Sequence, residues 1–343
     1  MANFLTVCRK ELGDQLGSKR YILLFILVIM LSTMSAYQGA SFIRNNPNAS
    51  FSSIFSGSPA GFSFVTLMVF FGPIIGLALG FDAINKERST GSLSVLLSQP
   101  IFRDSILNGK FLAGVASLAL MTASTVGIMV GVSIPLLGFG PSGADLTRIA
   151  FFALFTLLYL AFWLSLSLLF STAIKKTTSS ILAAISTWLF CVFIVSIMAS
   201  VVASAAVPVS MPTGFTAMSG GGIARFNEGG TNQTGPSTII FTQNMTIDFG
   251  RQMQDRAALE SAIQSISPSY LFSEAASAIL GGGSSSNVLG FIGSTSGAPF
   301  RGPGAGQSAA SSWPQVTAIA VGMVICFVAA YMLFLRREIR AGG

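Results

Sequence analysis

The sequence has 343 residues, of which 52% are hydrophobic and only 9% are charged. A soluble globular chain carries about 25% charged residues, so this composition excludes that class and indicates an integral membrane protein. The chain has no histidine, and its three cysteines, Cys8, Cys191 and Cys326, fit no metal-site or disulfide spacing.

The first 20 residues precede the first apolar run and predict a short amphipathic helix on the cytoplasmic side. In a helix over 2–17, the apolar side chains share one face, and Arg9, Lys10, Gly13 and Asp14 occupy the other. Such a helix is typical of the membrane interface, although a plain cytosolic tail is the alternative. A cleaved signal peptide ending near Ser35 is the rival interpretation of residues 1–40. The long polar start and the length of the apolar run favour a retained helix.

Six apolar runs follow, free of charged residues except for Lys110 near the start of the third, and each is long enough to cross a bilayer, for which about 20 helical residues are needed. They cover roughly residues 21–40, 61–81, 108–133, 149–171, 179–202 and 313–335. The predicted fold is therefore an all-α polytopic membrane protein with six transmembrane helices, five of them within residues 21–202. The sixth lies within 313–343, which ends in a cytoplasmic tail.

The charged residues predict the orientation of these spans. In a six-span arrangement, thirteen of the 19 basic residues and six of the 12 acidic residues fall on one side, so that side carries the whole net charge of +7. Basic loops stay in the cytoplasm. We expect a multi-pass protein of the plasma membrane with both termini in the cytoplasm, and no need for a nucleic-acid partner.

Residues 203–312 form a long segment on the opposite side and predict an extracytoplasmic domain. We expect a strand at 238–242, helices at 252–266 and 270–280, and a Gly/Ser-rich linker at 281–312. Three Asn-x-Ser/Thr sequons, at Asn48, Asn232 and Asn244, fall on this side; the motif is short, and unused sequons are an equally good interpretation.

The spans themselves carry little chemistry. No charged residue lies deep in any predicted span, which argues against a proton-driven antiporter but leaves sodium coupling open. In the second span, Gly72, Gly76 and Gly80 recur at every fourth position and form a smooth face for close helix contact. We expect a contact within the chain, with a dimer seam as the alternative.

The cytoplasmic loop 82–107 carries the most informative pattern. Residues 92–98 can form a short helix that places Leu93, Leu96 and Leu97 on one face, and Pro100 stops it. An apolar ridge on a cytosolic loop indicates a docking surface, or else a loop folded against the membrane.

The same loop resembles that of the type-2 ABC exporter permeases. The matching residues are Glu87, Arg88, Gly91, Ser92, Leu93, Leu96, Leu97, Ser98, Pro100, Arg103, Gly109 and Lys110. The start of the chain, with Arg9-Lys10-Glu11-Leu12, is similar to the family's connecting helix. The run Ser267–Phe272 resembles the segment before the last span, and Arg336–Ile339 the cytosolic end. The enlarged outer segment is similar in placement to that of permeases grouped with copper-enzyme maturation.

The resemblance implies a permease subunit of an ATP-driven ABC transporter, and export of a lipid-like, peptide-like or drug-like substrate. It implies an ATPase-coupling loop that uses Glu87, Arg88, Gly91, Leu93, Leu96, Leu97, Pro100 and Arg103. The partners would be a cytosolic ABC ATP-binding subunit, a second permease copy or homologue, and membrane lipids. The alternative is a non-transporting membrane scaffold or accessory subunit.

The sequence also predicts what this chain does not do. It has no Gly-x-x-x-x-Gly-Lys-Ser/Thr motif, because Gly109-Lys110 lacks the upstream glycine and is followed by Phe111. We therefore expect no catalytic residue, no metal and no cofactor in this chain, and we expect ATP to be bound and hydrolysed by the partner subunit.

Overall fold

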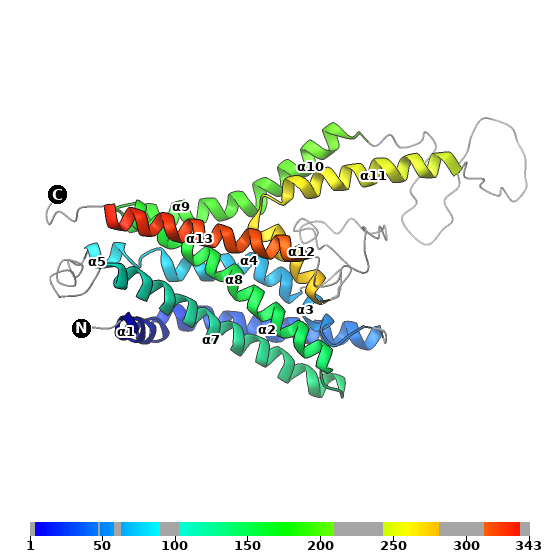
Figure 1. Ribbon diagram of the computed structural model, residues 1–343. Coiled ribbons are helices and arrows are strands. Elements are labelled where there is room, and N and C mark those ends of the chain that lie inside the picture. The colour runs from blue at the N-terminus through cyan, green and yellow to red at the C-terminus, as the bar shows by residue number, and fades with distance from the viewer. Residues whose placement is uncertain are drawn as a thin grey trace, which may run out of the picture. The chain divides into compact units, whose positions relative to one another are not determined.

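A computed structural model of the chain describes residues 4–46, 49–57, 63–89, 103–208, 243–280 and 312–336. All regular secondary structure in these residues is helical (Figure 1). The all-α fold class is therefore confirmed, whereas the strand expected at 238–242 lies outside the described residues.

Six helical segments among the described residues are long and apolar enough to span a membrane, as predicted. Five of them are built on α2 (Lys19–Asn45), α4 (Phe64–Gly80), α7 (Arg103–Leu137), α8 (Gly143–Ala173) and α13 (Trp313–Arg336). The fifth span in chain order joins three pieces, namely α9 (Thr177–Leu189), the π turn η1 (Phe190–Ile194) and α10 (Val195–Ala206).

Several shorter or more polar helices lie between the spans. They are α1 (Phe4–Leu16), α3 (Ser53–Ser56), α5 (Asn85–Ser89), α11 (Gln243–Gln264) and α12 (Pro268–Leu280). The helix expected at 252–266 begins earlier, at Gln243. The exposed face of α1 carries Arg9, Lys10, Gly13 and Asp14, as its sequence pattern predicts.

The chain divides into two compact units, residues 1–193 with 267–343, and residues 194–266. In the first unit α8 is the central helix: α4 and α13 pack along it, while α1 and α2 pack against α7 (Figure 1). We compare the share of residues that are buried in the most apolar stretch of each span. This share is 61% for the second span and 56% for the fourth, and 28% or less for the first, fifth and sixth. The second and fourth spans therefore form the core.

The glycine face of α4 explains how it reaches α8 so closely. A Cβ atom on Gly76 would lie 2.8 Å from the carbonyl oxygen of Leu160 and from the Cβ of Trp163, and one on Gly80 would lie 2.8 Å from the Cβ of Ser167. Real side chains do not approach so near, so only glycine permits this separation of the two helices. The expectation of a contact within the chain is confirmed.

Polar caps extend the helices beyond the apolar runs that predict them. Ser142 and Asp145 form a capping box at the start of α8, in which each side chain accepts the other's backbone N–H. The helix therefore begins at Gly143, before the span expected from residue 149. In the same way Ser18 accepts the N–H of Tyr21 and opens α2.

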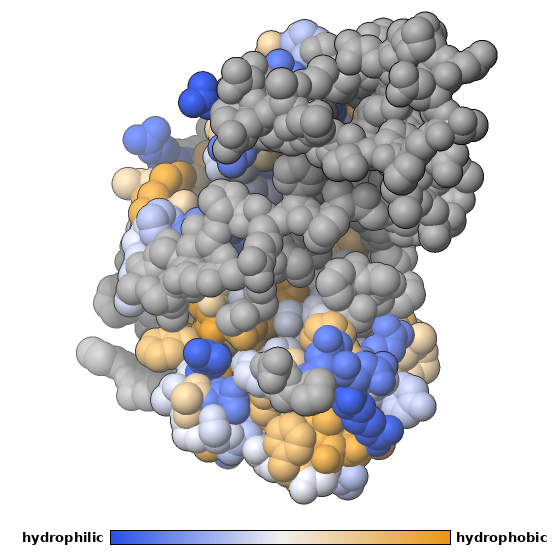
Figure 2. Space-filling model, turned by 90° about the vertical axis from the view of Figure 1, so that its right-hand side faces the viewer, coloured by the Kyte–Doolittle hydropathy of each residue, from blue (hydrophilic) through white to orange (hydrophobic). Residues whose placement is uncertain are grey.

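The outer sides of the first, fifth and sixth spans expose large apolar side chains, as a bilayer requires of the helices that face it. On α2 the most exposed of these are Leu23, Ile26, Met30 and Tyr37. Among the coloured residues of the face that Figure 2 shows, hydrophobic and hydrophilic residues are instead intermixed.

The second unit contains α10 and α11, which pack side by side. It does not coincide with the predicted segment 203–312, because it begins within the fifth span and ends at Ile266. The helix α12 belongs to the first unit, where Phe272, Ala275, Ala276 and Leu280 are fully buried. The predicted domain boundaries remain predictions, since this division by contacts does not follow the membrane surface.

Candidate functional site at the base of the 82–107 loop

A buried lysine joins three helices at the base of the loop. The Nζ atom of Lys110, on α7, lies 2.9 Å from Oε2 of Glu11 on α1 and 2.7 Å from Oε1 of Glu87 on α5. The Lys110 side chain is only 6% exposed, and both carboxylates are mostly buried. Charge-assisted hydrogen bonds offset the cost of removing the three charges from water. We call these three residues the Lys110 clamp.

The residue before the lysine allows α1 to cross α7 at short range. A Cβ atom on Gly109 would lie 2.9 Å from Cγ1 of Val7, so a larger residue would push α1 away. Further along the crossing, the hydroxyl of Ser117 donates to the side-chain oxygen of Gln15 (2.9 Å). The hydroxyl of Tyr21 donates to the carbonyl of Ser117 (3.0 Å). The pair Gly109-Lys110 therefore both admits α1 and binds it.

The start of the loop is attached to α8. The backbone N–H groups of Ile84 and Asn85 both point to the hydroxyl oxygen of Ser171, at 3.2 and 3.4 Å. The side chain of Ile84 packs with Leu107 and Phe334 in a small apolar cluster that joins the start of α5 to α7 and α13. These contacts fix the point at which the chain leaves α4 and enters the loop.

A second ion pair lies nearby on the surface. Arg20 donates to Asp82 at 2.5 Å, and its guanidinium group lies 5.4 Å from the centre of the Phe81 ring. Because Arg20 is 61% exposed, the pair contributes only about 0–1 kcal/mol. The buried clamp, and not this pair, is therefore the stronger constraint on the loop.

The structure describes part of the predicted coupling loop. Glu87 is placed by its bond to Lys110, while Arg88 lies on α5 and Arg103 begins α7. The remaining predicted residues of the coupling loop lie outside the described residues: Gly91, Leu93, Leu96, Leu97 and Pro100. The sequons at Asn48 and Asn232 also lie outside them, and Asn244 falls in the first turn of α11.

Sequence reasoning did not find the roles of Glu11 and Lys110. The sequence places Lys110 at the margin of a span that starts near 108, as one of many basic residues that set orientation. The helix instead begins at Arg103, and Lys110 is buried. The signal was present, because a lysine between apolar residues such as Leu107 and Phe111 needs a carboxylate partner.

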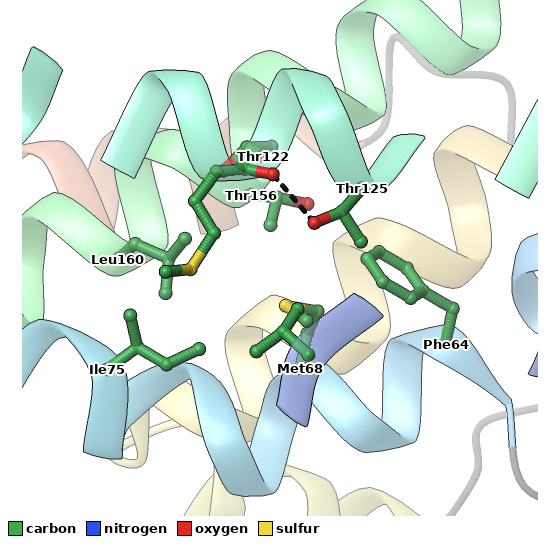
Figure 3. A pocket seen from close by; sticks show the side chains of 9 residues that line it. Phe64, Met68, Ile75, Thr122, Thr125, Thr156 and Leu160 are labelled. Carbon is green, nitrogen blue, oxygen red and sulfur yellow. Dashed lines mark hydrogen bonds between the residues drawn. The ribbon is translucent and has the colours of Figure 1, made fainter. Parts of the chain in front are cut away.

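A small cavity lies within the part of the bundle that the structure describes. A cavity of about 10 Å³ lies between α2, α4, α7 and α8, which is the volume of about one water molecule. Figure 3 shows Met68, Ile75 and Leu160 on its apolar side and three threonines opposite. The hydroxyl of Thr125 donates to the carbonyl of Met121 (2.6 Å). A solute larger than water does not fit this cavity.

Comparison with known proteins identifies the family. The model of the ABC-2 family transporter proteins matches residues 5–339, nearly the whole chain. The chain belongs to the ABC-2 transporter family. The resemblance drawn from the coupling loop and the two ends of the chain is thereby confirmed at the level of the family.

Two curated relatives support this assignment over part of the chain. Both are named probable ABC transporter permease protein NosY, one from Pseudomonas aeruginosa and one from Stutzerimonas stutzeri. The first is 36% identical over 118 residues, which is 34% of this chain and 40% of the relative. The second is 36% identical over 115 residues, which is 33% of this chain and 39% of the relative. The matches therefore span about two-fifths of each relative.

Proposed function

We propose that this chain is the permease subunit of an ATP-driven ABC exporter. It spans the plasma membrane with both termini and the 82–107 loop in the cytoplasm, and it pairs with separate cytosolic ATP-binding subunits. The family membership, the six spans and the names of the two relatives support a permease. The excess of basic residues on one side supports the orientation.

The observation that carries the proposal is the Lys110 clamp. A loop that receives motion from an ATPase must pass that motion to the spans, and for this it needs a stiff connection at its base. Glu87 lies at the start of the loop, Lys110 lies on the span that follows it, and Glu11 ties the connecting helix to both. A displacement of the loop base therefore moves α1 and α7 together.

A second permease copy or homologue completes the proposal. The cavity between α2, α4, α7 and α8 holds about one water molecule, so a lipid-like, peptide-like or drug-like substrate does not fit in it. We propose that substrate passes between two permeases. The exposed apolar sides of the first, fifth and sixth spans leave surface for both lipid and a partner.

The test asks whether an ATPase binds through the loop. If Leu96 lies on an apolar ridge that enters a cleft of the ATPase, Leu96→Asp places an unpaired charge in the interface at a cost of several kcal/mol. We expect the variant to lose the ATP-binding subunit on purification while the membrane part stays folded. Ser94→Asp, on the opposite face of the same predicted turn, should keep it. Full partner binding and partner-stimulated ATP hydrolysis by Leu96→Asp would favour the scaffold alternative.

A further inference from the structure

The start of α12 hydrogen-bonds to two other helices. The hydroxyl of Ser267 donates to the carbonyl of Cys191 in the π turn η1 (2.8 Å). The hydroxyl of Ser269 lies 3.0 Å from that of Tyr159 on α8, which in turn donates to the carbonyl of Val69 on α4 (3.3 Å). Since the tyrosine proton is used toward Val69, the serine is the donor to Tyr159.

Both backbone carbonyls lie where a helix is irregular. Pro73 has no N–H group, so the carbonyl of Val69, four residues earlier, lacks its usual helical partner. The π turn at 190–194 likewise shifts the backbone hydrogen-bond pattern of the fifth span. Away from water, the carbonyl released by Pro73 needs another donor, and the hydroxyl of Tyr159 supplies it. At the π turn, the hydroxyl of Ser267 donates to the carbonyl of Cys191.

Aromatic packing holds the tyrosine hydroxyl in this position. The ring of Phe272, one turn further along α12, stacks on the ring of Tyr159 with centroids 4.3 Å apart and an interplanar angle of 14°. The ring of Phe272 also stacks on the ring of Phe155, with centroids 5.4 Å apart and an interplanar angle of 22°. All three rings are buried, so the Tyr159 side chain has little freedom to turn away from Val69.

The proline divides α4 into two parts, and the second part leads to the Lys110 clamp. Residues 74–80 lie beyond the proline and continue through a turn into α5, which carries Glu87. Prolines in helices are points of bending. The face of this part toward α8 is formed by Gly76 and Gly80, and the hydroxyl of Ser167 on α8 donates to the carbonyl of Leu77 (2.8 Å). A change of angle at Pro73 would therefore have to shift this contact, and it would move Glu87.

We propose that Ser267, Ser269 and Tyr159 are positioning residues, which we call the α12 latch, and that the latch fixes the angle between the two parts of α4 at Pro73. The latch gives a role to the run Ser267–Phe272, which takes no part in the proposed coupling through the 82–107 loop. Because α12 follows residues 243–266 directly in the chain, a change in the segment before the last span reaches α4 through it. This second step rests on the proposed function; the fixing of the angle does not.

Hydrogen–deuterium exchange on the purified full chain tests the latch without any partner. In Tyr159→Phe or Ser269→Ala, we expect the amides of residues 81–89 to exchange about fivefold faster, as for the loss of one net hydrogen bond. Ser273→Ala is the matched control, since this buried serine on the same helix donates only to its own turn, at Tyr270. Faster exchange confined to α8 and α12, or equal in the control, overturns the proposal.

A second variant and a second readout keep the outcomes separate. If Tyr159→Phe does not fold, Ser267→Ala tests the same latch at η1, and unchanged exchange at 190–194 and 81–89 counts against the proposal. In the assembled transporter, Ser269→Ala should retain the ATP-binding subunit but lose several-fold in the ATP hydrolysis that the complex shows after reconstitution into lipid vesicles. Unchanged hydrolysis contradicts the second step. If no ATPase binds the wild-type chain, the proposed function fails while the exchange result stands.

Discussion

Replacing Lys110 with methionine removes the cation of the clamp while preserving most of the side-chain volume. Glu11 and Glu87 then face each other across a buried site, since one oxygen of each lies within 3 Å of the lysine nitrogen. Those two oxygens are no more than 5.6 Å apart, and two like charges at that distance repel by roughly 3 kcal/mol at an effective dielectric constant of about 20. That figure agrees with the roughly 3–5 kcal/mol lost when one partner of a buried ion pair is removed.

The helix expected to respond is α1, because its packing on α7 and its bond to Lys110 hold it in place. A loss of about 3 kcal/mol raises the population of undocked α1 on the order of a hundredfold. Native Cys8 lies in this contact and reports it. In a background with Cys191→Ser and Cys326→Ser, we expect a maleimide to label Cys8 much faster in Lys110→Met than in the parent.

The control and the rescue make this expectation refutable. Lys175→Met removes an exposed lysine and should leave Cys8 labelling unchanged. Adding Glu11→Gln and Glu87→Gln to Lys110→Met removes the repulsion, and most of the parent's slow labelling should return. If Lys110→Met labels no faster than Lys175→Met, or if the triple variant is no better than the single one, charge pairing does not dock α1.

Three further outcomes are expected. Gly76→Ala should lower the free energy of unfolding of the detergent-purified chain by about 1–3 kcal/mol, because the new Cβ would overlap the Cβ of Trp163. Gly127→Ala, whose Cβ would have nothing within 4 Å, should leave that free energy unchanged or raise it by up to about 1 kcal/mol. In intact cells an impermeant thiol reagent should modify Ser285→Cys and spare Ser94→Cys, and the reverse pattern would invalidate the proposed orientation. The isolated chain should show no saturable ATP binding, because it lacks the glycine loop for phosphate; such binding would contradict the division of labour with a partner.

The sequence predicts the number of spans well and their ends less well. A charge-free run of about 20 apolar residues is a bulk property of the helix, so hydropathy alone finds it. The ends depend on local hydrogen bonds, which hydropathy does not register. The capping box of Ser142 and Asp145 extends α8 beyond its apolar run, and α7 begins at Arg103 inside the predicted loop.

At the candidate site, too, the features that depend on neighbouring residues could be predicted, and the contacts between distant residues could not. The loop motif is contiguous, so its resemblance to a family can be read directly from residues 87–110. One partner of Lys110 is distant in the sequence, because Glu11 lies on α1, which precedes the first span. Only the crossing of α1 and α7 brings them together. The π turn could not be predicted from a proline or a glycine, because its sequence, Phe-Cys-Val-Phe-Ile, contains neither.

The polar contacts of the bundle have a common arrangement that connects its two ends. The hydroxyls of Tyr159 and Ser267 donate to backbone carbonyls of α4 and of the fifth span, and Ser269 donates to Tyr159. Where α4 ends, Ser171 accepts backbone N–H groups. Each such bond contributes only about 1 kcal/mol, so any one can exchange without unfolding the helices. The three charges of the Lys110 clamp are held more strongly. A bundle with exchangeable bonds along its core and a firm ionic joint at the loop base can change the angle between the two parts of α4 while keeping α1, α5 and α7 moving as one.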